Sequence, residues 1–214
     1  MILYLNPAVG ISGDMLLGAL IGLGAPPDEV RTAITCSGLT GWRLDVEQVD
    51  RFGLRATRAV VTVADLPPER RARDLIAMAE RAAPPEVAVQ AVSCLKQIAE
   101  VEAAIHGVSP HDVHLHELGG DDTLIDVIGV AAALQLLGVT GVHSTPVALG
   151  NGAAPTAHGI LPMPAPATAA LLADAVVVGV DLTTETVTPT GAALLAMMKT
   201  SFAPVPVMTL RATA

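Results

Sequence analysis

Histidine and carboxylate side chains, which bind divalent metal ions, are concentrated in one short segment of this chain. Four of the six histidines lie between His106 and His116, and the run His114-Leu115-His116-Glu117 is followed by Asp122 and Asp126. Imidazole nitrogens and carboxylate oxygens suit ions such as Ni²⁺ and Zn²⁺. Because these residues are so close in sequence, a single loop would supply several ligands. Metal binding is therefore the first hypothesis for this segment.

The spacing of His114 and His116 favours an extended backbone. In a strand, residues i and i+2 share a face, so both imidazoles would point the same way while Leu115 turns towards the core. In a helix the two side chains would lie about 200° apart around the axis. The structural alternative is that both histidines are ordinary polar positions and that Glu117 and the aspartates cap the next helix. The spacing alone leaves both interpretations open.

Two turns precede predicted helices, and the first of them is a candidate anion site. Residues 2–6 form an apolar run typical of a buried strand, and Gly10-Ile11-Ser12-Gly13-Asp14 then leads into an apolar periodic stretch. Ser12 or Asp14 can cap that helix, and the backbone N–H groups of its first turn can bind a phosphate. A second such turn, Thr188-Pro189-Thr190-Gly191, precedes the last predicted helix. The first pattern matches neither the dinucleotide fingerprint nor the P-loop, so capping and phosphate binding both stay open.

The rest of the sequence alternates strand and helix patterns, which predicts an α/β fold. The patterns place strands at residues 2–6, 42–49, 54–63, 141–149 and 175–180, and helices at 15–23, 28–37, 85–104, 122–137, 167–172 and 192–198. A further helix after Pro67-Pro68 is expected to expose Arg70, Arg71 and Arg73 to solvent. We predict a single α/β domain over residues 1–214, with helices packed on a layered sheet and functional loops at one sheet edge. A helical segment at about 67–106 is inserted in it.

Composition and charge exclude several classes of protein. The 214-residue chain has a net charge of −9, one Trp, one Tyr and two Phe, which opposes binding to nucleic acid through phosphates or stacked bases. Its apolar stretches are broken by Gly and Pro, so no membrane span is predicted. The N-terminus lacks the basic region of a signal peptide, and the distant Cys36 and Cys94 suit reduced, buried thiols. A cytoplasmic protein is therefore expected.

Four longer motifs resemble those of a known family. They are Gly10-Ile11-Ser12-Gly13-Asp14-Met15, Val113-His114-Leu115-His116-Glu117-Leu118-Gly119, the stretch from Ala157 to Thr168, and Thr188-Pro189-Thr190-Gly191-Ala192. Together they resemble the LarC family of nickel insertion proteins, which mature the cofactor of lactate racemase. The resemblance implies a CTP-dependent nickel chelatase of the lyase class that uses CTP with Mg²⁺ or Mn²⁺. Its substrate would be a pyridinium-3,5-bisthiocarboxylic acid mononucleotide, and a homo-oligomer is expected.

The resemblance extends to individual positions of the motifs. The matching residues are Asp14, His114, His116, Glu117, Asp122, His158 and Thr190. From their types we infer a nickel-binding set comprising His114, His116, Glu117 and His158, and a catalytic set comprising His116, Glu117 and Asp122. The two helix starts would receive the phosphate of a nucleotide through Ser12, Gly13, Asp14, Thr188, Thr190 and Gly191.

Two departures from the family pattern lead to an alternative. Asn6 and Val9 stand where family members typically carry aspartate and serine, which removes a carboxylate from the first turn. The family also continues into a second domain of comparable size, which is expected to be absent here. The alternative is a nickel-binding or assembly module that needs a separate C-terminal subunit and does not itself turn over CTP.

A further alternative follows from the histidines without the resemblance. His114, His116 and His158 would be the three protein ligands of a zinc-dependent hydrolase, with Glu117 or Asp122 as the base. Such an enzyme should prefer zinc to nickel and act without a nucleotide.

Overall fold

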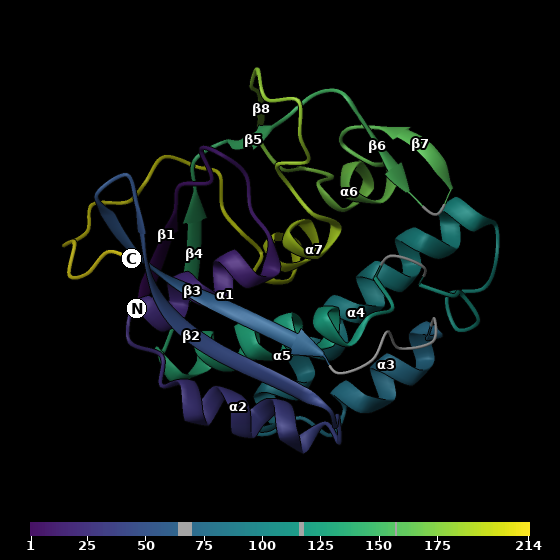
Figure 1. Cartoon of the computed structure of the whole chain (residues 1–214), viewed down its shortest axis with the longest axis horizontal. Helices are drawn as coiled ribbons and strands as arrows, with labels where there is room; N and C mark the ends of the chain where they lie inside the picture. Colours follow the sequence, from purple (N-terminus) through teal and green to yellow (C-terminus); the bar gives the residue numbers. More distant parts are fainter. Residues whose placement is uncertain (64–69, 116–117, 157) are drawn as a thin grey trace.

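The computed structural model describes residues 1–63, 70–115, 118–156 and 158–214 and has a mixed α/β fold (Figure 1). Its strands are β1 (Ile2–Leu5), β2 (Trp42–Arg51), β3 (Leu54–Val63), β4 (Gly141–Ser144), β5 (Val147–Leu149), β6 (Ala153–Thr156), β7 (Gly159–Pro162) and β8 (Val177–Gly179). Its helices are α1 (Gly13–Gly22), α2 (Pro27–Cys36), α3 (Ala72–Ala79), α4 (Pro85–His106), α5 (Asp121–Leu136), α6 (Pro166–Leu171) and α7 (Pro189–Met197). The predicted α/β class is confirmed. None of the helices in these ranges is both long and apolar enough to cross a lipid bilayer.

The strands pair two by two within the described ranges. β1 pairs with β4 and β5 with β8 in parallel, whereas β2–β3 and β6–β7 are antiparallel hairpins. The strand predicted at 141–149 is divided at Thr145 and Pro146, because proline has no N–H for a strand ladder. Its two halves, β4 and β5, therefore pair with different partners. The region expected to be a loop around 150–159 instead forms the β6–β7 hairpin.

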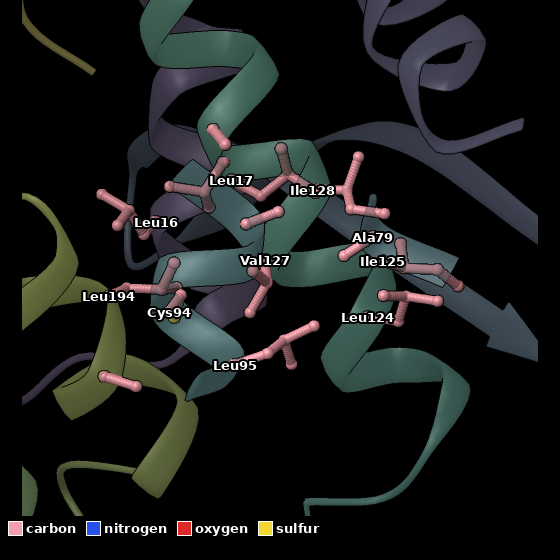
Figure 2. Close-up of a cluster of buried hydrophobic side chains, with 14 of the residues drawn as sticks. Leu16, Leu17, Ala79, Cys94, Leu95, Leu124, Ile125, Val127, Ile128 and Leu194 are labelled. Atoms are coloured by element: carbon pink, nitrogen blue, oxygen red, sulfur yellow. The ribbon is translucent and has the colours of Figure 1, made fainter. Parts of the chain in front are cut away.

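α5 is the central helix of the hydrophobic core. Apolar residues surround it on all sides, and such a helix must be covered on all sides. Figure 2 shows its residues packed against α1 and α4, in a cluster that includes Leu17, Leu95, Leu124, Ile125 and Ile128. These five side chains are fully buried, and burial of each contributes about 1.5–3 kcal/mol. α5 therefore fixes the positions of the helices around it.

Neither cysteine forms a disulfide. Cys94 is buried in the core, and burial raises the pKa of its thiol to about 12, so it stays protonated. Cys36, at the end of α2, is exposed, which differs from the buried position expected from its helical context.

The starts of α1 and α7 are held side by side by a short parallel bridge. The N–H of Ile11 donates to the carbonyl of Thr186 at 2.8 Å, and the N–H of Thr188 donates to the carbonyl of Ile11 at 3.2 Å. Gly191 allows this approach, because a Cβ there would collide with the carbonyl oxygen of Ile11 and lie 2.9 Å from its carbonyl carbon. Two turns that are far apart in sequence thus lie next to each other.

The arginine-rich segment differs from the solvated helix that was predicted. α3 begins only at Ala72, and Arg71, just before it, has an extended backbone. This backbone pairs with the segment after α4: the N–H of Leu115 donates to the carbonyl of Arg70 at 3.2 Å. The guanidinium of Arg70 contacts Asp121 at the start of α5 at 2.8 Å, so it links two elements instead of facing solvent.

Candidate functional site

A cavity of about 410 Å³ opens where the first turns of α1, α5 and α7 meet. Its walls come from the segments 12–14, 58–61, 118–126 and 185–190, and β3 provides the second of these. Figure 1 shows the three helices gathered in the middle of the molecule, with β3 running past α1 and α5. The cavity therefore lies where the fold joins the N-terminal turn to the C-terminal part of the chain.

Three helix starts give the cavity a positive electrostatic component. The first N–H groups of a helix lack intrahelical acceptors, and its dipole places partial positive charge at this end. α7 begins three residues earlier than predicted, and Thr188 caps it, because its Oγ1 accepts the N–H of Gly191 at 3.1 Å. Ser12 occupies the N-cap position of α1, but its hydroxyl donates to the Asp14 carboxylate and caps no N–H. These helix starts, with the hydroxyl of Thr190, can receive an anion such as a phosphate.

Carboxylates line the same cavity. Asp14, Asp122, Asp126 and Glu185 all face it, and Arg58 is a basic residue of its wall. Burial, and after it the negative charges of Asp14 and Asp122, together raise the pKa of Asp126 to about 8. Within the described part of the chain, Oδ1 of Asp126 is buried without a hydrogen-bond partner. Asp126 is therefore largely protonated at neutral pH, and a cation bound nearby would release its proton.

The glycines of the predicted cofactor-binding set have packing functions. A Cβ on Gly13 would lie 2.7 Å from both Cβ and Cγ of Asp126, so only glycine lets this carboxyl group reach the first turn of α1. Gly191 stands against Ile11 and contributes the N–H that Thr188 accepts. The other predicted members of this set, Ser12, Asp14, Thr188 and Thr190, line the cavity.

The predicted metal ligands that the structure describes, His114 and His158, do not line the cavity. His114 is exposed and forms a short antiparallel bridge with Arg71, in keeping with the extended backbone that was expected. His158 lies on the β6–β7 turn with its ring centroid 5.0 Å from that of His106 at the end of α4. His116 and Glu117 lie outside the described residues. Among the described histidines, cysteines and carboxylates, no group of three or more is already arranged to hold a metal ion.

Three charged residues of the cavity were absent from the predicted catalytic, cofactor-binding and metal-binding sets. Asp126 follows Asp122 by one helical turn, so the sequence contained the signal that both share one face of α5. Glu185 lies just before the Thr188 turn, so the sequence alone placed an acidic side chain next to a predicted binding turn. Arg58 lies in an ordinary alternating strand, and only the packing of β3 against α1 brings it to the cavity.

A double substitution tests the histidine pair. His114→Ala combined with His116→Ala should weaken nickel binding by at least about tenfold, the loss typical of a change near a bound metal. Calorimetric titration with Ni²⁺ measures this, with His111→Ala as the control because His111 is an exposed histidine beside Asp112. An unchanged affinity in the double variant would remove both residues from the metal site.

The fold and the cavity define an α/β protein suited to bind an anionic ligand together with a cation. Comparison with known proteins narrows this class. The chain belongs to the family of nickel insertion proteins, whose family model, described as "Nickel insertion protein", matches residues 3–214.

Individual relatives agree with this family. The chain is 44% identical over 211 residues to a candidate nickel insertion protein of Geobacter metallireducens, covering 97% of this chain and 54% of the relative. It is also 44% identical over 208 residues to the pyridinium-3,5-bisthiocarboxylic acid mononucleotide nickel insertion protein of a Nocardioides species, covering 96% and 52%. The chain thus spans about half the length of these relatives, and no solved structure matches it. The zinc hydrolase hypothesis receives no support from relatives of this kind.

Proposed function

We propose that the chain takes part in inserting Ni²⁺ into pyridinium-3,5-bisthiocarboxylic acid mononucleotide, with the cavity as the reaction site. The observation that carries this proposal is the meeting of three helix starts and four carboxylates in one cavity. The helix starts suit the phosphate of a mononucleotide, and the carboxylates suit a divalent ion beside it. The name of the Nocardioides relative supports the same substrate.

The residues divide into two functional groups. Ser12, Thr188 and Thr190 would bind the phosphate at the starts of α1 and α7. The family resemblance implies a product in which one carbon and two sulfur atoms of the mononucleotide bind nickel. Formation of the nickel–carbon bond replaces a ring hydrogen, so one proton must leave the pyridinium ring when the metal enters. Asp122, whose side chain is exposed in the cavity, would accept this proton, together with the predicted catalytic residues His116 and Glu117.

The use of CTP with Mg²⁺ or Mn²⁺ is a second part of the proposal. A cavity of about 410 Å³ is at the small end of ligand sites, so it suits one nucleotide at a time. Calorimetric titration with Ni²⁺ and with Zn²⁺, each with and without CTP and Mg²⁺, tests this part. Nickel binding that CTP strengthens would support a nucleotide site in this chain, whereas CTP-independent binding would place that site elsewhere.

An insertion assay tests the reaction itself. The chain is incubated with Ni²⁺, CTP, Mg²⁺ and the mononucleotide, with and without the C-terminal half of the Nocardioides relative, and the nickel product is measured by mass spectrometry. Asp122→Asn should lower the insertion rate by about tenfold or more. Asp181→Asn, an exposed aspartate outside the cavity, is the control. A rate equal to that of the unmodified protein would exclude Asp122 from the reaction.

Two observations favour the alternative of a module that needs a C-terminal partner. The chain covers about half of its relatives, and an apolar groove of about 1,020 Å³ lies between β1, α1 and residues 208–214. Ile2, Tyr4 and Met15 line this groove and are large, exposed apolar residues. If the product forms only after addition of the relative's C-terminal half, this alternative holds. A cytoplasmic location and a homo-oligomer stay predictions.

A further inference from the structure

We propose that the guanidinium of Arg58 binds the phosphate group of the ligand in the cavity and thereby selects nucleoside monophosphates over neutral nucleosides. Arg58 belongs to β3 and to the wall of the cavity. Among the described residues that line the cavity, it alone has a positively charged side chain. The inference rests on the proposed use of the cavity by a mononucleotide and adds the side chain that recognises its phosphate.

The close packing of β3 against α1 places Arg58 beside the first turn of that helix. A Cβ on Gly18 in α1 would lie 2.8 Å from the carbonyl oxygen of Thr57 and 3.5 Å from Cα of Arg58. Glycine at position 18 therefore allows the backbone of β3 to approach the helix. The backbone of Arg58 is held near the start of α1, whereas its side chain is exposed and long enough to turn towards a ligand.

The guanidinium of Arg58 has no ion pair or hydrogen bond with the described part of the chain. Glu47 lies directly opposite on β2, but the two side chains do not form an ion pair. By contrast, the side chains of Arg31, Arg70 and Arg81 each bind an oxygen atom of the protein. The Arg58 guanidinium is therefore available to a phosphate, which it can bind through two parallel N–H···O bonds.

The acidic side chains of the cavity make a cation necessary for an anionic ligand. Asp14, Asp122 and Glu185 line the same cavity and would repel a phosphate. The N–H groups at the helix starts offset only part of this repulsion, because a helix end carries about half an elementary charge. Arg58 adds a full positive charge, which attracts a phosphate and leaves a neutral nucleoside unaffected. Discrimination between these two classes of ligand is therefore expected to depend on Arg58.

Calorimetric titration of the intact chain with CMP, inorganic phosphate and cytidine, at low salt and without metal, tests this inference. Arg58→Gln should weaken the binding of CMP and of phosphate by at least about tenfold, as expected for the loss of a hydrogen bond to a charged group. Arg58→Lys keeps the charge but loses the planar fork, so an intermediate loss is expected. Cytidine, which lacks the phosphate, should bind equally to all three proteins.

Arg55→Gln is the matched control, because Arg55 is an exposed arginine of β3 that does not line the cavity. It should bind CMP as the unmodified protein does, and thermal unfolding checks that each variant is folded. If Arg58→Gln does not fold, the comparison of Arg58→Lys with the unmodified protein decides the test. Added NaCl should weaken CMP binding more in the unmodified protein than in the glutamine variant.

Three results would overturn the role of Arg58. They are equal CMP affinity of the Arg58 variants and the unmodified protein, an equal loss of cytidine binding in Arg58→Gln, and no CMP binding by the unmodified protein. The insertion assay judges nickel insertion separately. Absence of the nickel product together with Arg58-dependent CMP binding would overturn only the insertion function, and product formation with Arg58-independent CMP binding would overturn only the role of Arg58.

Discussion

Asp126→Asn should make the protein more stable at pH 8 and leave its stability almost unchanged at pH 4. The pKa of Asp126 is raised from 3.8 to about 8 in the folded protein, chiefly by burial and then by the charges of Asp14 and Asp122. Between pH 3.8 and about pH 8, the carboxyl group of Asp126 keeps its proton in the folded protein and loses it in the unfolded protein. The favourable contribution of Asp126 to the free energy of unfolding is therefore fully present below pH 3.8 and is lost as the pH rises towards 8.

The expected size of this effect is large. Each pH unit in this window changes the free energy of unfolding by about 1.4 kcal/mol, so the variant should gain on the order of 4 kcal/mol over the unmodified protein between pH 5 and pH 8. Urea unfolding at several pH values measures the difference between the two proteins. Asp181→Asn, at an exposed position, is the control and should follow the unmodified protein. Parallel stability curves for Asp126→Asn and the unmodified protein would show that Asp126 ionises normally.

Gly191→Ala should destabilise the folded protein by about 3 kcal/mol, the upper part of the range for overpacking. The added methyl group would meet the carbonyl group of Ile11 and lie 3.2 Å from Cα of Ser12. These are backbone atoms that cannot rotate away. The starts of α1 and α7 would have to separate, which would break the hydrogen bond from the N–H of Thr188 to the carbonyl of Ile11 and open the cavity.

A second glycine provides the control for this substitution. Gly179 in β8 has no atom within 4 Å of an added Cβ, so Gly179→Ala should change the free energy of unfolding by little. Thermal and urea unfolding of the two variants measure the contrast. Similar stabilities for both would mean that α7 can shift relative to α1 at low cost.

Much of the fold could be predicted because local patterns determine it. The sequence patterns placed α2 and α5 to within one residue at each end. The parallel pairing of β1 with β4 and of β5 with β8 could not be predicted, because it joins segments that are far apart in the chain. Arg70 shows the same limit: its charge suggested a solvated helix, but its partner Asp121 lies in another element.

The candidate site could also be predicted only in part from the sequence. Ser12, Thr188 and Thr190 were identifiable because residues at helix starts carry recognisable sequence signals. The neighbourhood of His106 and His158 was not, because it arises from the packing of α4 near the β6–β7 turn and has no local spacing. Patterns along the chain thus identify the kinds of ligand, and tertiary packing decides which of them meet.

The cavity has walls from four segments that span most of the chain, from residue 12 to residue 190. No partly folded state can contain it, so a ligand of the cavity binds only the native protein. Such a ligand at a hundred times its Kd would therefore add about 2.7 kcal/mol to the free energy of unfolding of the chain. The melting temperature becomes a binding assay that requires no knowledge of the reaction. Screening nucleotides and metal ions for thermal stabilisation would rank the natural ligands directly.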